Sequence, residues 1–196
     1  MKFMLGLIAG FVLVPLVFVL YLVSGFAPTA ATDKPFPGET WLANAALNKR
    51  MQREAPTRDI STLTTPDLIA GADIYKKDCA FCHGLPDQPP PVVANGMFPP
   101  APQEMRVPPG RGPGQGSANG GPPRPAGPGQ GLVAGRGASG DFWRVKNGVR
   151  LTGMPSFQSS LTDDQIWQVV GLLARRRNMA PEVKAELLGE TPSAPR

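Results

Sequence analysis

The sequence has very few residues that could bind a metal or form disulfide bonds. Its 196 residues include one histidine and two cysteines, and only 18% of them are charged. Two cysteines exclude a framework of several disulfides, and one histidine excludes a metal centre with several histidine ligands. The length allows one modest globular domain and excludes a large multidomain enzyme. Any chemistry must therefore depend on very few side chains.

Glycine and proline, by contrast, are abundant, with 23 and 24 residues. They concentrate in residues 107–140, a stretch with three arginines and no acidic residue. Such a composition buries too little apolar surface to offset the entropy lost on ordering. We therefore expect a disordered Gly/Pro-rich loop inserted in the globular domain. Contact of its arginines with an acidic partner or an anionic lipid is the alternative to an inert loop.

A long uncharged stretch opens the chain, from Phe3 to Val23. A helix of that length reaches about 31 Å, which matches the ~30 Å hydrocarbon core of a bilayer. Cleaved signal peptides have apolar cores of only about 7–15 residues, so we expect residues 1–27 to be an uncleaved transmembrane anchor, although the alanines after it leave cleavage open. Lys2 on the short N-terminal flank predicts a cytoplasmic N-terminus and an exported remainder.

The exported part divides by composition into three segments. Residues 28–61 are interpreted as a spacer that contains a possible short helix from Trp41 to Arg53. Residues 62–178 are predicted to form the globular domain. The last segment, residues 179–196, is interpreted as a C-terminal tail.

Two amphipathic helices are predicted in the globular domain. The first begins with Thr65 as N-cap, followed by Pro66 and Asp67. Its apolar face consists of Leu68, Ala72, Tyr75 and Cys79. The second begins with a capping box of Thr162 and Gln165, which Leu161 and Ile166 flank as a hydrophobic staple. Its buried stripe consists of Ile166, Val169, Val170 and Leu173.

The two cysteines and the histidine form one motif, Cys79-Ala80-Phe81-Cys82-His83. This is C-x-x-C-H, the attachment sequence for c-type haem. Two thiols three positions apart, just after a helix, can each add to a vinyl group on one edge of the porphyrin, and the next residue can ligate the iron. We therefore predict one covalent haem c, attached at Cys79 and Cys82, with His83 as an iron ligand.

Two other uses of a C-x-x-C pair lack the required context. A thioredoxin-like redox pair normally follows a strand, whereas a helix is predicted before Cys79. A zinc site needs four ligands, and the chain offers only Cys79, Cys82 and His83.

The second axial position of the iron separates an electron carrier from a catalyst. No second histidine exists, so a methionine, a weaker oxygen or nitrogen ligand, water or an empty site remain. Met154 is favoured because Pro155 keeps it out of the helical conformation, in an extended Gly153-Met154-Pro155 strap. Met97 is the alternative ligand, since it also follows a glycine but lies nearer the attachment motif. The remaining methionines outside the apolar stretch are Met51, Met105 and Met179.

The order of these elements resembles a membrane-anchored, single-haem class I cytochrome c. The resemblance covers about residues 62–177, with a gap at the loop. It includes the helix that leads into the C-x-x-C-H motif, the stretch Asn147–Pro155 and the terminal helix with Trp167. It implies an all-α cytochrome c domain in which the first and last helices cross near a glycine and an aromatic residue. The residues here that match this crossing are Gly71, Tyr75, Trp167 and Gly171.

The resemblance also implies residues that support or contact the haem. A proline carbonyl soon after the motif is expected to accept a hydrogen bond from the other ring nitrogen of His83. The candidate prolines are Pro86, Pro89, Pro90 and Pro91. Weaker candidates for haem contacts are Tyr75, Trp143 and Arg150, of which the last two can reach a propionate. Core packing and ordinary surface charge explain these three equally well.

The predicted function is electron transfer rather than catalysis. A His/Met haem has no open coordination site, and methionine ligation raises the reduction potential. We expect a single-pass protein of the bacterial inner membrane, with its haem domain on the periplasmic face. The expected partners are a quinol-oxidising complex, a terminal oxidase or a dehydrogenase, and no nucleic acid. The alternatives are an obligate cytochrome subunit of a dehydrogenase or oxidase complex, and a haem enzyme or gas sensor with an open iron site.

Overall fold

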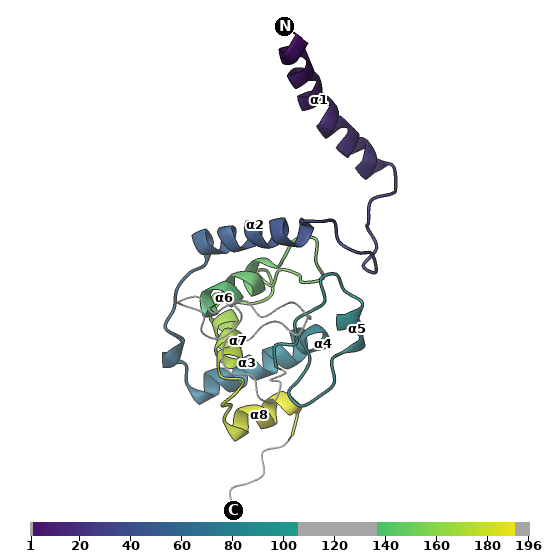
Figure 1. Cartoon of the computed structure of the whole chain (residues 1–196). Coiled ribbons are helices and arrows are strands. Elements are labelled where there is room, and N and C mark those ends of the chain that lie inside the picture. Colours follow the sequence, from purple (N-terminus) through teal and green to yellow (C-terminus); the bar gives the residue numbers. More distant parts are fainter. Residues whose placement is uncertain (1, 106–136, 191–196) are drawn as a thin grey trace, which may run out of the picture. The chain divides into compact units, whose positions relative to one another are not determined.

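The computed structural model describes residues 2–105 and 137–190, and within these ranges all regular structure is helical (Figure 1). This confirms the all-α class. The predicted loop of residues 107–140 lies outside the described residues, apart from its last positions, and Ala138 already begins a helix there. The elements are α1 (Lys2–Val23), α2 (Glu39–Glu54), the 3-10 turn η1 (Ile60–Thr62), α3 (Thr65–Asp78), α4 (Ala80–His83), α5 (Val92–Asn95), α6 (Ala138–Asn147), α7 (Asp163–Ala174) and α8 (Pro181–Leu188).

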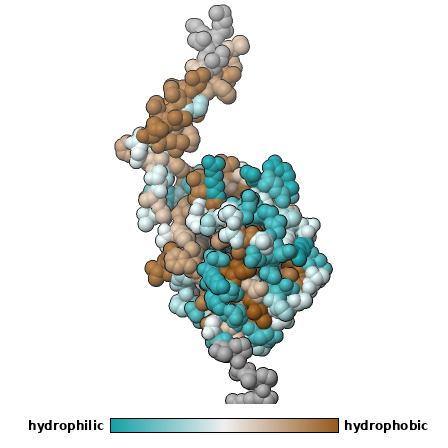
Figure 2. All heavy atoms as spheres, turned by 180° about the vertical axis from the view of Figure 1, so that it is seen from behind, coloured by the Kyte–Doolittle hydropathy of each residue, from teal (hydrophilic) through white to brown (hydrophobic). Residues whose placement is uncertain are grey.

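Helix α1 belongs to a first unit of the chain, which ends at residue 43. The helix continues through Pro15, and its apolar side chains are exposed along most of its length (Figure 2). Near the end of α1, the ring of Tyr21 packs edge to face with that of Phe36, with 5.8 Å between the ring centroids. Among the described residues, no helix reaches the combined length and apolarity needed to cross a membrane.

The core of the second unit, residues 44–196, is built where α3 meets α7. The two helices approach so closely at Gly71 that a Cβ there would overlap the carbonyl oxygen of Gln168. A Cβ on Gly171 would overlap the side chain of Leu63, which lies between η1 and α3. Of the two predicted crossing glycines, Gly71 therefore lies at the close helix contact that the resemblance implies, whereas Gly171 makes room for a side chain of the preceding loop.

The two predicted aromatic residues lie in different parts of the core. Tyr75 is buried with the residues that join α3, α7 and α8. Trp167 instead stacks on Phe142 of α6, with 4.4 Å between the ring centroids. This stack joins α6 to α7 in a second cluster, which also holds Ile166 and Val170. The predicted stripe of α7 is confirmed, because all four of its residues are buried.

The beginnings of α3 and α7 test the predicted caps. Thr162 and Gln165 form the predicted capping box, since each side chain bonds to the other residue's backbone N–H. In α3 the N-cap is Thr64 rather than Thr65. The backbone N–H and the hydroxyl of Thr64 both donate to Asp67, at 2.9 and 2.7 Å, so Asp67 does stabilise the first turn.

The segment predicted as a C-terminal tail is part of the folded domain. Val183 and Leu187 of α8 are fully buried against α3 and α7. The ammonium of Lys76 in α3 donates to the carboxylate and the backbone carbonyl of Glu186. The boundary after residue 178 is therefore wrong, because two apolar side chains at i and i+4 give α8 a face that packs on the core.

The C-terminal end of the predicted spacer, residues 28–61, also packs with the domain. Helix α2 covers the predicted range from Trp41 to Arg53, with two more residues at its start and one at its end. Met51 near its end is buried, and Ile60 packs against the cluster that contains Phe142. Residues after about position 50 therefore contribute to the packed domain.

Candidate functional site

The C-x-x-C-H residues form one tight turn at the end of α3. Cys79 closes α3 and caps α4, whose single turn ends at His83. The backbone N–H groups of Cys82 and His83 both donate to the carbonyl of Cys79, at 3.1 and 2.9 Å. Both cysteines are partly buried and not joined by a disulfide. The turn thus holds two thiols and one imidazole within four residues of a rigid helix end.

The environment of Cys79 is apolar. Its side chain packs against the core that joins α3, α7 and α8. Burial, together with the nearby charges of Asp78 and Cys82, raises the pKa of the Cys79 thiol to about 12. The thiol is therefore protonated at neutral pH, whereas redox-active cysteines have a lowered pKa. The apolar packing of Cys79 thus contrasts with the surroundings that activate a redox cysteine.

The ring of His83 is oriented by one hydrogen bond. Its Nδ1 lies 2.8 Å from the carbonyl oxygen of Pro102. A carbonyl can only accept, so Nδ1 carries the proton and Nε2 keeps its lone pair for a metal. The expected proline carbonyl is thus present, but it belongs to Pro102 and to none of the four candidates. Those candidates are Pro86, Pro89, Pro90 and Pro91.

A glycine allows the chain to turn directly after His83. Gly84 has φ +72°, and a Cβ there would lie 2.7 Å from Oε1 of Gln103. The carbonyl of Gly84 accepts the hydroxyl of Tyr75 at 2.9 Å. Burial raises the pKa of Tyr75, so the phenol stays protonated and can donate. Tyr75 therefore supports the loop after the motif through its hydroxyl.

Met154 lies in a closed loop of residues 148–156, called the Met154 loop below. The backbone N–H of Val149 donates to the carbonyl of Met154 at 3.1 Å, which joins the two ends. The hydroxyl of Thr152 donates to the carbonyl of Val149 at 2.7 Å and accepts from the N–H of Met154 at 3.2 Å. A Cβ on Gly148 would lie 2.7 Å from the backbone of Pro155. The backbone around Met154 is therefore fixed by its own hydrogen bonds.

Met97 contacts this same loop. Its Sδ lies 3.0 Å from the position that a Cβ on Gly153 would take. The structure thus brings the two favoured methionines to the same segment, although 57 positions separate them in the sequence. Met105 and Met179 instead pack with the core around α3, and Met51 is buried in α2.

Two of the weaker candidates, Trp143 and Arg150, lie in α6 and in the loop that follows it. The indole N–H of Trp143 donates to Oε2 of Glu54 at 3.2 Å, so it is engaged by a carboxylate of α2 rather than free for a propionate. Arg150 is exposed in the Met154 loop. Arg144 of the same helix is buried and lies 3.6 Å from Asp141, so its guanidinium pairs within α6.

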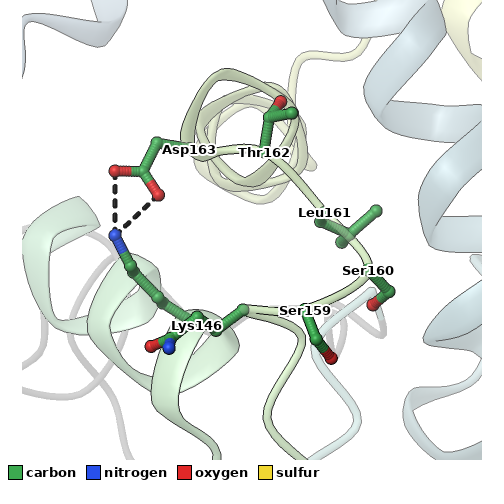
Figure 3. Close-up of a pocket in the computed structure, with 7 residues that line it drawn as sticks. Lys146, Ser159, Ser160, Leu161, Thr162 and Asp163 are labelled. Carbon is green, nitrogen blue, oxygen red and sulfur yellow. Dashed lines mark hydrogen bonds and ion pairs between the residues drawn. The ribbon is translucent and has the colours of Figure 1, made fainter.

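An open hollow of about 610 Å³ lies between the end of α6 and the start of α7 (Figure 3). Residues 158–163 line it, and Lys146 donates across it to both carboxylate oxygens of Asp163, at 2.7 and 2.9 Å. None of the predicted haem residues lines this hollow. Its ion pair ties α6 to the first turn of α7, which is a structural role.

The donor set suits a covalently attached haem. Attachment and ligation of haem c use two thiols, an imidazole nitrogen and often a methionine sulfur. Here Cys79 and Cys82 are not joined by a disulfide, and the Nδ1 contact of His83 leaves the lone pair of Nε2 available. Met154 lies in a loop whose backbone is constrained by hydrogen bonds. The absence of a side chain on Gly84 leaves room for Gln103 next to the motif. Cys79, Cys82 and His83 are the residues that would hold the group.

Comparison with known families identifies a matching family. Residues 66–173, more than half of the chain, match the family described as cytochrome C oxidase, cbb3-type, subunit III. This range contains the C-x-x-C-H motif, the Met154 loop and all of α7 except its last residue. The match shows a class I c-type cytochrome domain, whose cofactor is covalently bound haem with its iron. No curated protein and no solved structure matches the chain.

Proposed function

The chain belongs to this family, the cbb3-type cytochrome c oxidase subunit III family, and we propose that it is a one-electron carrier with a single haem c. In this proposal the haem is attached through Cys79 and Cys82, and its iron is ligated by His83 and Met154. The observation that carries the proposal is the 2.8 Å contact between His83 Nδ1 and Pro102 O, directly after a C-x-x-C turn. That contact leaves Nε2 available to an iron.

Each residue of the site has a distinct task in the proposed function. The haem iron supplies a centre that gains or loses one electron. His83 would hold the iron from a rigid helix end, with its imidazole kept in one tautomer by the carbonyl of Pro102. Met154 would be the second residue to hold it, from a loop that its own hydrogen bonds constrain, and would leave no position for a substrate. The chain's residues therefore favour electron transfer over catalysis.

We further propose that residues 1–27 anchor the protein in a bacterial inner membrane, with the haem domain on the periplasmic side. The support is the uncharged stretch from Phe3 to Val23 and the fact that covalent haem attachment takes place on the exported side in bacteria. An anchored carrier would meet its partners in two dimensions. A quinol-oxidising complex, a terminal oxidase and a dehydrogenase remain the proposed partner classes.

A second candidate function is that of a fixed subunit of an oxidase complex. The description of the matching family, a subunit of a cytochrome c oxidase, favours it. Co-purification separates the two: a fixed subunit stays with its complex through mild detergent extraction and size-exclusion chromatography, whereas a carrier elutes alone. A haem enzyme or gas sensor is the third alternative, and carbon monoxide binding to the reduced wild type would support it.

Covalent attachment is tested by mass and spectrum together. The full chain, expressed with a c-type haem maturation system, should keep its haem through acid extraction and show a pyridine haemochrome spectrum typical of two thioether bonds. Cys79→Ala should leave one thioether bond and shift that spectrum. A wild-type mass equal to that of the bare polypeptide would overturn the proposed function.

A further inference from the structure

His83 and Gln103 are joined by a reciprocal pair of hydrogen bonds. His83 Nδ1 donates to the carbonyl of Pro102, the residue before Gln103, at 2.8 Å. Gln103 Nε2 donates to the carbonyl of Cys82, the residue before His83, at 3.1 Å. Each side chain thus binds the peptide group that precedes the other residue. Two such bonds fix both the separation and the relative orientation of the two segments, whereas a single bond would leave a hinge.

The side chain of Gln103 is itself held in one position. Its second amide hydrogen is used by the carbonyl of Ala101, at 3.0 Å, so the Nε2 group satisfies two acceptors. Its Oε1 lies against Gly84, in space that any Cβ would fill. Gly84 is in turn held by the hydroxyl of Tyr75. The amide is therefore partly buried between the C-x-x-C-H turn and the segment that carries Pro102.

We propose that Gln103 is a positioning residue for the iron ligand His83. It acts by fixing the Pro102 carbonyl that accepts from Nδ1. The inference rests on the proposed function, because it concerns the haem-bound state in which His83 Nε2 ligates iron. Sequence reasoning gave no sign of this role, since a glutamine in a proline-rich stretch has no motif and bonds to a residue 21 positions away.

The consequence for the iron follows from the chemistry of imidazole. A hydrogen bond from Nδ1–H to a carbonyl makes the ring a stronger donor at Nε2 and so favours the oxidised iron. If the Pro102 carbonyl loses its fixed position, that hydrogen bond weakens and His83 donates less. The reduction potential then rises, although Gln103 itself does not touch the iron.

The test uses the full-length haem-loaded protein and the fact that His83 is the only histidine in the sequence. Gln103→Leu removes both donors, and Gln103→Glu keeps the size but replaces the donor group by a carboxylate that repels carbonyl oxygens. Gln52→Leu, at an exposed position of α2, is the matched control. The readouts are the exchange rate of the His83 Nδ1 proton by NMR of the reduced protein, and the reduction potential by titration.

Both Gln103 variants should exchange the Nδ1 proton up to about tenfold faster than wild type, as expected when the hydrogen bond from Nδ1 to the Pro102 carbonyl is weakened or lost. Both should also have a more positive potential, while Gln52→Leu matches wild type. If the variants only have a lower melting temperature, while the exchange rate of the Nδ1 proton and the reduction potential are unchanged, Gln103 has a purely structural role and the inference is overturned. If Gln103→Leu does not load haem, Gln103→Glu decides. A wild type without covalent haem would instead count against the proposed function.

Discussion

The indole of Trp143 in α6 and the carboxylate of Glu54 at the end of α2 are bonded across 89 positions of sequence, with 3.2 Å between Nε1 and Oε2. The same carboxylate accepts from Arg50 and Arg53 at about 3.0 Å. This contact attaches the end of α2 to the helix that precedes the Met154 loop. It also explains why Trp143, predicted as a weak haem contact, directs its N–H elsewhere.

The Glu54 contact predicts a pH dependence of stability. Hydrogen bonds from Arg53 and Arg50, with a smaller one from Trp143, lower the pKa of Glu54 from 4.5 to about 2. A carboxyl whose pKa is lower in the folded state contributes stability that is complete above 4.5 and is lost as the pH falls toward 2. Glu54→Gln should therefore melt below wild type at pH 7 and lose less on acidification.

Thermal melting between pH 7 and pH 2.5 measures this effect. Glu190→Gln, at an exposed position after α8, is the control and should follow wild type throughout. If the melting temperatures of wild type and Glu54→Gln are equal at every pH in this range, Glu54 does not contribute to stability.

The crossing of α3 and α7 predicts that Gly71→Ala is destabilising. The added Cβ would meet the carbonyl group of Gln168, which belongs to a helix backbone and cannot move aside. We expect a loss of about 1–3 kcal/mol in the free energy of unfolding, although alanine favours helices by itself. Denaturant unfolding measures it. Gly96→Ala is the control, because there the nearest atom to the new Cβ, the carbonyl oxygen of Val93, is 3.6 Å away.

Periodicity and capping residues predicted α3 and α7, because those signals are local, whereas α6 was not predicted and begins inside the stretch interpreted as a loop. Thr162 and Gln165 cap α7 as expected, and the stripe from Ile166 to Leu173 is buried. The shift of the α3 cap from Thr65 to Thr64 arose because two adjacent threonines can both cap. The carboxylate of Asp67 selects Thr64, which lies three residues before it.

Helix α8 was missed although its signals are local too. Pro181 stands in its first turn, and Gly189 ends it with φ +70° and ψ +22°. Val183 and Leu187 lie four positions apart on one face of the helix. Two apolar residues are too few to distinguish a packed helix from a tail by sequence alone. Only the folded chain shows that α3 and α7 offer a surface on which they can be buried.

The site shows a different limit of sequence reasoning. The attachment turn could be predicted because its residues are contiguous. The Pro102 acceptor could not, because the resemblance implies a proline soon after His83, whereas the chain passes through α5 before it returns to His83. The contact of Met97 with Gly153 is likewise a property of the folded chain.

Helix α8 predicts a matched pair of leucine variants. Leu187 is fully buried, so Leu187→Ala should lower the free energy of unfolding by about 2–5 kcal/mol. The adjacent Leu188 is only partly buried, and Leu188→Ala should cost clearly less. Denaturant unfolding of both variants measures the difference. Equal, negligible effects would mean that residues 181–188 are a tail after all.

Met154 and Met97, the two candidates for the second iron ligand, are distinguished by a pair of alanine variants. If Met154 ligates the iron, Met154→Ala should abolish the sulfur-to-iron absorption band of the oxidised protein, lower the reduction potential and allow the reduced protein to bind carbon monoxide. Met97→Ala should keep the band, because in this assignment Met97 only packs against Gly153. Loss of the band in Met97→Ala alone would make Met97 the ligand. An unchanged spectrum in both variants would show that neither methionine binds the iron, and it would favour the open-site alternative over electron transfer.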